Sequence, residues 1–127
     1  MTEQWLPARG WVGLYEVSDH GGVRSVERDV GGRERSTRHL KGKMLTPRIR
    51  AADGVMVVNL WRDGQYRQIP VRRLVLEAFD QPRPRGFDAI NTDGDLTNNA
   101  LPNLAWSPDK RLRNTYSGVM SLLNYRR

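Results

Sequence analysis

The stretch from residue 55 to residue 71 most constrains the fold, because two strand-forming runs are separated there by a tight-turn dipeptide. Residues 55–61 (VMVVNLW) are rich in β-branched and aromatic side chains, which favour a pleated, extended chain. Asp63 and Gly64 follow, and an Asp-Gly pair suits the left-handed backbone of a two-residue hairpin turn. Residues 66–71 then return as a second strand. The pattern predicts an antiparallel β-hairpin in the middle of the chain.

A helix is predicted directly after this hairpin, over residues 71–79. Its apolar residues recur at the spacing of one helical face, which places Arg72, Arg73 and Glu77 on the outer face. Residues 81–86 (QPRPRG) contain two prolines and a glycine, so the helix should end there and a linker should follow.

The first third of the chain reads as short strands. Residues 14–17 and 23–26 alternate between apolar and polar side chains, as half-buried strands do. Residues 30–38 are polar and contain glycine, and we interpret them as a mobile basic loop. Residues 43–49 are a weaker strand candidate, because Pro47 restricts them to a sheet edge or a bulge.

The last third has the pattern of a ββα unit. Residues 87–91 and 103–106 are predicted strands, and residues 92–102 form a long polar loop between them. Ser107 followed by proline and aspartate is a strong helix start, so a helix is predicted over residues 108–116. The chain as a whole is therefore predicted to be α+β.

The charge balance favours a polyanionic partner. Lysine and arginine together number 21 against 14 acids, giving a net charge of +7, and 18 of the 21 are arginine. The planar arginine fork suits phosphate oxygens and the guanine edge. A GC-rich genome would also enrich arginine without any functional reason. The basic residues nevertheless concentrate in residues 24–50 and 108–127, and contact with nucleic acid explains both blocks.

Several classes are disfavoured by composition. The chain has no cysteine, which excludes disulfides and cysteine-ligated zinc. No apolar run approaches the length needed to span a bilayer, and the first residues lack the pattern of a secretory signal. We therefore expect a cytoplasmic protein with no membrane partner.

Three segments resemble parts of one nuclease family, in the family's order. Residues 11–25 (WVGLYEVSDHGGVRS) resemble the YEVS-x-x-G-x-VRS opening of the NUMOD4 module, which accompanies phage and intron-type HNH endonucleases. Residues 71–79 (VRRLVLEAF) are similar to the linking VHRLVAxAF helix. Residues 93–106 are similar to the DGxxxNN…NLxW block of the HNH, or His-Me finger, domain. The resemblance implies a NUMOD4-like β module with its linking helix in residues 1–80, and an HNH-like ββα-metal finger in residues 87–127.

The same resemblance implies that the catalytic side chains have been replaced. The family's general-base histidine, two residues before the Asp-Gly pair, corresponds to Asn91, and a carboxamide does not titrate near neutral pH. The metal-ligand positions correspond to Ile90 and Leu112, which offer no lone pair to a hard cation. Asn103 survives, but its family role is to brace the loop. Arg72 stands where the linking helix has its histidine.

Other polar side chains could in principle rebuild a site. Asp93 and Asp95 flank Gly94, and a pair of carboxylates can hold a divalent ion, but we favour a structural Asp-Gly-Asp turn. His20 and His39 lie outside the ββα unit, and we interpret them as loop residues or phosphate contacts rather than bases. We expect no catalytic or metal-binding residue, and Mg²⁺ or Mn²⁺ would be needed only by an active nuclease.

The sequence therefore predicts a protein that binds double-stranded DNA, derived from an HNH endonuclease and catalytically inactive. The residues expected to contact DNA are Arg24, Arg28, Arg33, Arg35, Arg38, Lys41, Lys43, Lys110, Arg111 and Arg113. Two alternatives stay open: a weak or rearranged metal-dependent endonuclease, and an inhibitor that binds a host protein. The sequence does not choose an oligomeric state or a DNA site.

Overall fold

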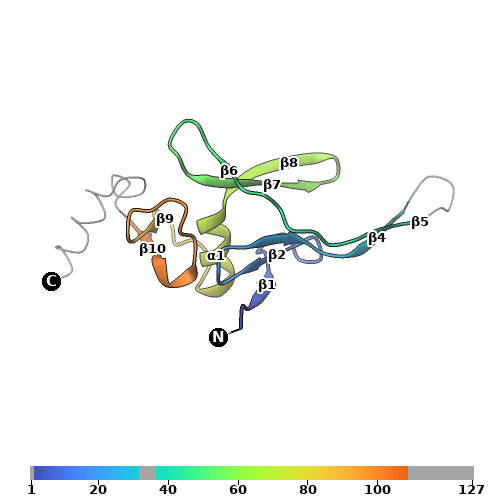
Figure 1. Ribbon diagram of the computed structural model, residues 1–127, viewed down its shortest axis with the longest axis horizontal. Helices are drawn as coiled ribbons and strands as arrows, with labels where there is room; N and C mark the ends of the chain where they lie inside the picture. Colours follow the sequence, from blue (N-terminus) through green and yellow to red (C-terminus); the bar gives the residue numbers. More distant parts are fainter. Residues whose placement is uncertain (1, 32–36, 109–127) are drawn as a thin grey trace.

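The computed structural model describes residues 2–31 and 37–108 of the chain (Figure 1). The elements follow in the order β1 (Trp5–Pro7), β2 (Tyr15–Ser18), β3 (Val23–Ser25), β4 (Arg28–Gly31), β5 (Thr37–Leu40), β6 (Arg48–Ile49), β7 (Met56–Arg62), β8 (Gln65–Pro70), α1 (Val71–Phe79), β9 (Asp88–Asn91), the 3₁₀ turn η2 (Leu101–Asn103) and β10 (Leu104–Ser107). The described residues confirm the α+β prediction.

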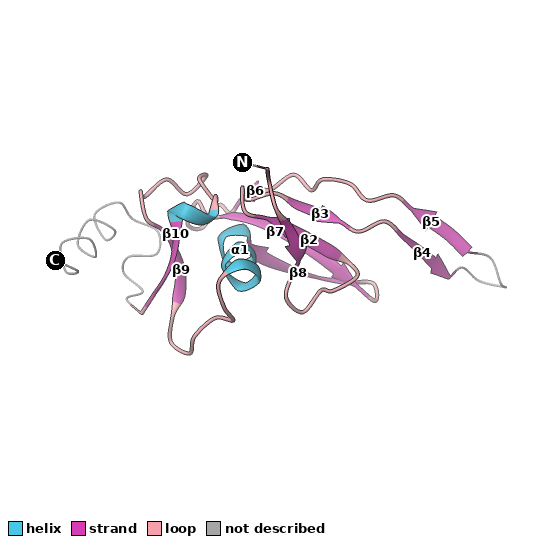
Figure 2. Ribbon diagram, turned by 90° about the horizontal axis from the view of Figure 1, so that it is seen from below, coloured by secondary structure: helices cyan, strands magenta, loops and turns pink. Residues whose placement is uncertain are grey.

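The strands form small antiparallel sheets: β1-β2-β3, β4-β5, β6-β7-β8 and β9-β10. Both views show α1 between the β9-β10 pair on one side and the two three-stranded sheets on the other, while the β4-β5 hairpin projects at the far end (Figures 1 and 2). The strands of the expected finger, β9 and β10, pair with Asn91 opposite Leu104. The helix expected after them, over residues 108–116, lies outside the described residues except for its first residue.

The central hairpin forms as predicted. Strands β7 and β8 pair from Val57 opposite Pro70 to Arg62 opposite Gln65. Asp63 and Gly64 both have positive φ, 53° and 75°, as a two-residue turn that matches the strand twist requires. The hairpin is tied to the N-terminal sheet, because the Trp61 backbone N–H donates to the Tyr15 hydroxyl at 3.0 Å.

One hydrophobic core joins the N-terminal sheet, the central hairpin, α1 and the β9-β10 pair. Its buried members are Ala8, Trp11, Tyr15, Val17, Val23, Val58, Leu60, Val71, Leu74, Val75, Leu76, Ala89, Leu104 and Trp106. Helix α1 therefore packs on two sides. No helix of the described residues has the length and apolar character needed to cross a bilayer.

The placement of Arg72 on an outer helix face was wrong. Arg72 is only 5% exposed. Strand β9 covers the face of α1 that would be exposed to solvent if the helix had a single apolar face. The long side chain reaches across to β9 and bonds there. Arg73, in contrast, is exposed, and its Nε donates to Glu77 at 2.5 Å.

The basic loop of residues 30–38 was also predicted wrongly at its two ends. Strands β4 and β5 include both ends of this segment, where Val30 pairs opposite Arg38 and Gly31 opposite Thr37. Alternation is hidden there by glycine and charged residues, so periodicity gave no strand signal. The strand expected over residues 43–49 shrinks to β6 and one isolated bridge between Met44 and Arg24, consistent with Pro47 interrupting the ladder.

Candidate functional site

The loop that follows β9 is a closed turn built by its own aspartates. Gly94 has a φ of 78°, a conformation that favours glycine. Asp93 Oδ1 accepts the Asp95 backbone N–H at 2.8 Å, and Asp95 Oδ1 accepts the Thr97 N–H at 3.0 Å. These aspartates bond to their own loop, as expected of an Asp-Gly-Asp turn.

Asn103, the last residue of η2, braces this loop, as the resemblance implied. Its Oδ1 accepts the Thr92 hydroxyl at 2.9 Å and the Asp93 N–H at 3.1 Å. Its Nδ2 donates to Asp93 Oδ1 and to the Asn98 carbonyl, both at 2.9 Å. The whole carboxamide is therefore engaged in holding the loop.

Asp93 is held ionised by these donors. Burial alone would raise its pKa, but hydrogen bonds from the Asp95 N–H and from the Asn103 and Asn98 amides outweigh it, so the pKa of Asp93 lies below its usual value. Asn98 donates to Asp93 Oδ2 at 3.1 Å, so both carboxylate oxygens accept hydrogen bonds.

Asn91, at the position of the expected general base, is enclosed. It is 1% exposed at the end of β9. The Arg72 guanidinium donates to its Oδ1 at 2.9 Å. Its Nδ2 donates to the Asn98 carbonyl at 2.9 Å and to Asn99 Oδ1 at 3.0 Å. Asn91 thus bridges α1 to the loop, and each polar atom of its side chain is bonded within the protein.

The metal that the family implies does not fit the residues present. Ile90 is fully buried at one expected ligand position and has only carbon atoms to offer. The other position, Leu112, lies outside the described residues, and its side chain is also aliphatic. Within residues 2–31 and 37–108, His, Asp and Glu side chains form no group of three able to hold an ion.

The structure places only part of the expected DNA-contacting set. Arg33, Arg35, Lys110, Arg111 and Arg113 lie outside the described residues, and Arg38 is described only by its place in β5.

Two of the residues expected to contact DNA also make bonds within the protein. Arg24 donates to Glu16 at 2.9 Å and stacks over the Trp5 ring at 3.9 Å from its centroid. Arg28 donates to the backbone carbonyls of Leu14 and Val26. Lys41 and Lys43 are exposed, with no side-chain hydrogen bond or ion pair to a described residue.

His39 lies between two carboxylates on the β4-β5 hairpin. Its Nδ1 is 2.8 Å from Asp29 Oδ1 and its Nε2 is 2.6 Å from Glu27 Oε1. The hydrogen bonds to Asp29 and then Glu27 raise the pKa of His39 above its ordinary value. The histidine is a local ion-pair centre, far from Asn91 along the chain.

The described residues form a two-stranded unit with an asparagine-braced loop, joined through α1 to a β-rich module, which is the arrangement that the resemblance to HNH-type endonucleases implied. Comparison with known proteins agrees. Residues 3–61 match the NUMOD4 motif. The chain is 29% identical over 107 residues to DNA endonuclease I-HmuI of Bacillus phage SP01, a match covering 84% of this chain and 53% of that protein.

A solved structure described as "DNA binding and cleavage by the HNH homing endonuclease I-HmuI" matches with a TM-score of 0.68 and 26% identity. The match covers 97% of this chain and 59% of that one. The NUMOD4 match and the two I-HmuI matches support placing this chain in the NUMOD4-containing HNH-type endonuclease family. The chain spans about half the length of the curated relative it matches.

Sequence reasoning missed that Arg72 and Asn91 touch. The signal was present, because the family pattern has a histidine at each of the two positions and this chain has neither. Two departures that occur together suggest a contact. A set of arginines around Trp11 was also missed, because the residues lie far apart in sequence and meet only in the fold.

Proposed function

We propose that this chain binds double-stranded DNA on an HNH endonuclease scaffold and does not cut it. The observation that carries the proposal is the state of Asn91. A general base must reach an attacking water with a group that accepts a proton near neutral pH. Asn91 has no such group, and its carboxamide is buried and bonded to Arg72 and to the loop.

The DNA-binding half of the proposal is supported by charge and by family. The chain carries a net charge of +7, concentrated in residues 24–50 and 108–127. Lys41 and Lys43 are exposed in the first of these blocks. The related I-HmuI is described as binding and cleaving DNA. Electrostatic contact with phosphates needs only the basic surface and survives loss of the catalytic groups.

A rearranged nuclease that uses Asp93 and Asp95 is less well supported. Both oxygens of Asp93 accept hydrogen bonds from the loop, and Asp95 Oδ1 accepts from the Thr97 N–H and hydroxyl. A metal bridging Asp93 and Asp95 would compete with these bonds, which close the loop that Asn103 braces.

The test measures binding and nicking on the same preparation. We expect retention of a blunt duplex of mixed sequence at about 50 mM salt, weakening about a thousandfold by about 200 mM if about six phosphates are contacted. We expect no nicking of supercoiled plasmid with Mg²⁺ or Mn²⁺. Lys43→Ala should reduce the salt slope by about one unit.

A restored variant provides the positive control for nicking. Ile90→Asp and Leu112→Asn restore side chains of the kind that bind the metal in the family, and Asn91→His restores the general base. Arg72→His is added, because a buried guanidinium beside the new imidazole would disfavour its protonated form. Nicking by the wild-type chain at a rate near that of the folded quadruple variant would overturn the proposal. Absence of duplex retention at low salt would overturn its binding half.

A further inference from the structure

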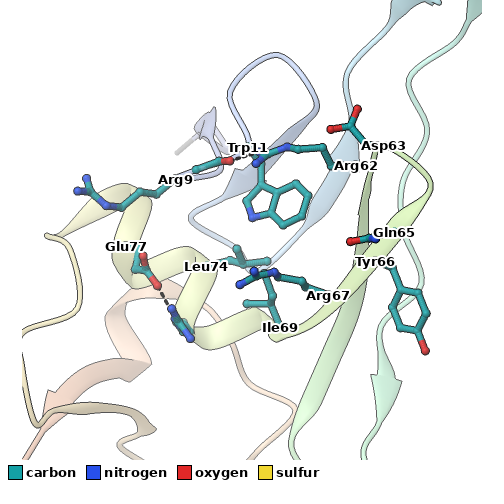
Figure 3. A pocket seen from close by; sticks show the side chains of 12 residues that line it. Arg9, Trp11, Arg62, Asp63, Gln65, Tyr66, Arg67, Ile69, Leu74 and Glu77 are labelled. Atoms are coloured by element: carbon teal, nitrogen blue, oxygen red, sulfur yellow. Dashed lines mark hydrogen bonds and ion pairs between the residues drawn. The ribbon is translucent and has the colours of Figure 1, made fainter.

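A pocket of about 480 Å³ lies where the β1-β2 loop, strand β8 and helix α1 meet (Figure 3). All of its lining residues fall between residues 9 and 77, so it does not include Asn91 or the loop after β9. Its volume is in the range of small-molecule sites. Four arginines and two acids line it, which leaves an excess of positive charge.

The floor of the pocket is apolar and largely buried. Trp11 is 8% exposed and packs edge-on against Tyr15, with ring centroids 5.9 Å apart. Leu74 of α1 is 3% exposed, and the partly buried Ile69 of β8 completes the floor. Figure 3 shows Leu74 and Ile69 directed into the hollow below the Trp11 ring. These buried side chains support the pocket from beneath.

Arg62 covers the indole of Trp11. Its guanidinium carbon lies 4.4 Å from the ring centroid, and its Nη2 donates to the Gly10 carbonyl, which fixes the plane of the group. Arg62 is exposed, so the guanidinium face turned away from Trp11 is open. A planar guanidinium backed by an indole is a stacking platform for a planar base.

Two further arginines of the pocket, Arg67 and Arg9, carry positive charge that no acidic side chain of the described residues pairs with. Arg67 points into the hollow in Figure 3, whereas Arg9 lies at the opposite rim with its side chain directed away from the hollow. Both are exposed, and neither makes a hydrogen bond or ion pair with a described residue. Arg73 differs, because its pairing with Glu77 neutralises it. Free arginine forks bind phosphate groups through paired hydrogen bonds.

We propose that this pocket binds one nucleoside phosphate, with its base stacked on Arg62 above Trp11 and its phosphate held by Arg67. A peptide carboxylate or inorganic phosphate would use the positive charge but leave the stacking face of Arg62 unoccupied. The nucleotide can be free or can be an unpaired residue of a strand. Nucleotide binding in this pocket is distinct from duplex binding and is measured with no duplex present.

The experiment titrates the full chain with dAMP and with 2-deoxyribose 5-phosphate by calorimetry at low salt. We expect dAMP to bind about tenfold more tightly, because the sugar phosphate has no base to stack. Arg67→Ala should weaken dAMP by at least about tenfold. Arg62→Lys keeps the charge but removes the plane, and should weaken dAMP by about fivefold while leaving the sugar phosphate unchanged. Arg85→Ala, an exposed arginine outside the pocket, is the matched control with an expected change below about twofold.

Equal affinity for dAMP and the sugar phosphate would overturn the proposal, since the pocket would then be an anion site only. So would no dAMP binding, or an equal loss in the Arg67 and Arg85 variants. The source of the nucleotide is resolved by a short single-stranded oligonucleotide. If Arg67→Ala weakens the oligonucleotide as much as dAMP, the pocket holds a nucleotide of a strand; if it weakens dAMP alone, the ligand is free nucleotide.

Discussion

Replacing Asn91 with leucine tests whether the former base position now stabilises the protein. The two side chains have similar size, so the change removes polar contacts and leaves most of the packing in place. Three hydrogen bonds are lost: one from the buried Arg72 guanidinium at 2.9 Å, and two to Asn98 and Asn99 at 2.9 and 3.0 Å. A bond to a charged group contributes about 1.5–3 kcal/mol and a neutral one about 1 kcal/mol. The free energy of unfolding should therefore fall by about 3–5 kcal/mol.

Urea unfolding followed by tryptophan fluorescence at pH 7 measures this loss. A chain of this size should also show a melting temperature lower by roughly 10–20 °C. Gln68→Leu is the matched control, because Gln68 is an exposed amide on β8 with no side-chain hydrogen bond to a described residue. That substitution should change stability by less than about 0.5 kcal/mol. A loss below about 1 kcal/mol for Asn91→Leu would refute the account of Asn91 as a bridge.

A double-mutant cycle then isolates the pair. Arg72→Met removes the guanidinium while keeping an unbranched apolar chain, and it also removes other interactions of Arg72. The loss in the double variant should be smaller than the sum of the two single losses by about 1.5–3 kcal/mol, the contribution of a charge-assisted bond. Additive losses would mean that the two residues stabilise the fold independently.

Two further predictions concern pH. Asp29 and Glu27 raise the pKa of His39, so the ion pairs of His39 stabilise the fold fully below the unfolded pKa of 6.5. This stabilisation is lost as pH rises through the higher folded pKa, and the urea midpoint should fall over that range. His39→Gln should flatten the fall. The Arg50 guanidinium lowers the pKa of Asp53 from 3.8 to about 2. The Arg50–Asp53 ion pair therefore stabilises the fold above pH 3.8, and this stabilisation disappears as pH falls towards 2. An Asp53→Asn variant whose urea midpoint drops as steeply as that of the wild type between pH 3.8 and 2 would contradict this expectation.

The elements with strong local signals were predictable. The hairpin of β7 and β8 combines β-branched runs with an Asp-Gly turn, and α1 follows a clear helical period. The short strands β1 and β4 were not found, because three or four residues with prolines, glycines or charges carry too little periodicity. Their pairing depends on partners that only the tertiary fold brings alongside.

The candidate site divides in the same way. The turn at Asp93 and the bracing role of Asn103 follow from a motif in one stretch of chain, and the structure confirms both. Burial of Arg72 could not follow from the helical period, since the period assumes one covered face and α1 has two. A long side chain with a charged end normally reaches solvent. Here its end reaches an amide instead, which only the position of β9 makes possible.

Helix α1 shares one hydrophobic core with the N-terminal sheets and with the β9-β10 pair, and this limits how these segments can be exchanged between proteins. Leu76 of α1, Ala89 of β9 and Trp106 of β10 belong to one buried cluster, although a surface linker at residues 81–86 separates the helix from the strands in sequence. A protease that cuts within that linker should leave two fragments that co-elute, because the cut breaks no packing. A recombination junction at the same place would combine core residues of α1 from one parent protein with core residues of β9 and β10 from another. Gene shuffling in such a family should therefore succeed more often with α1 and both strands inherited as a block.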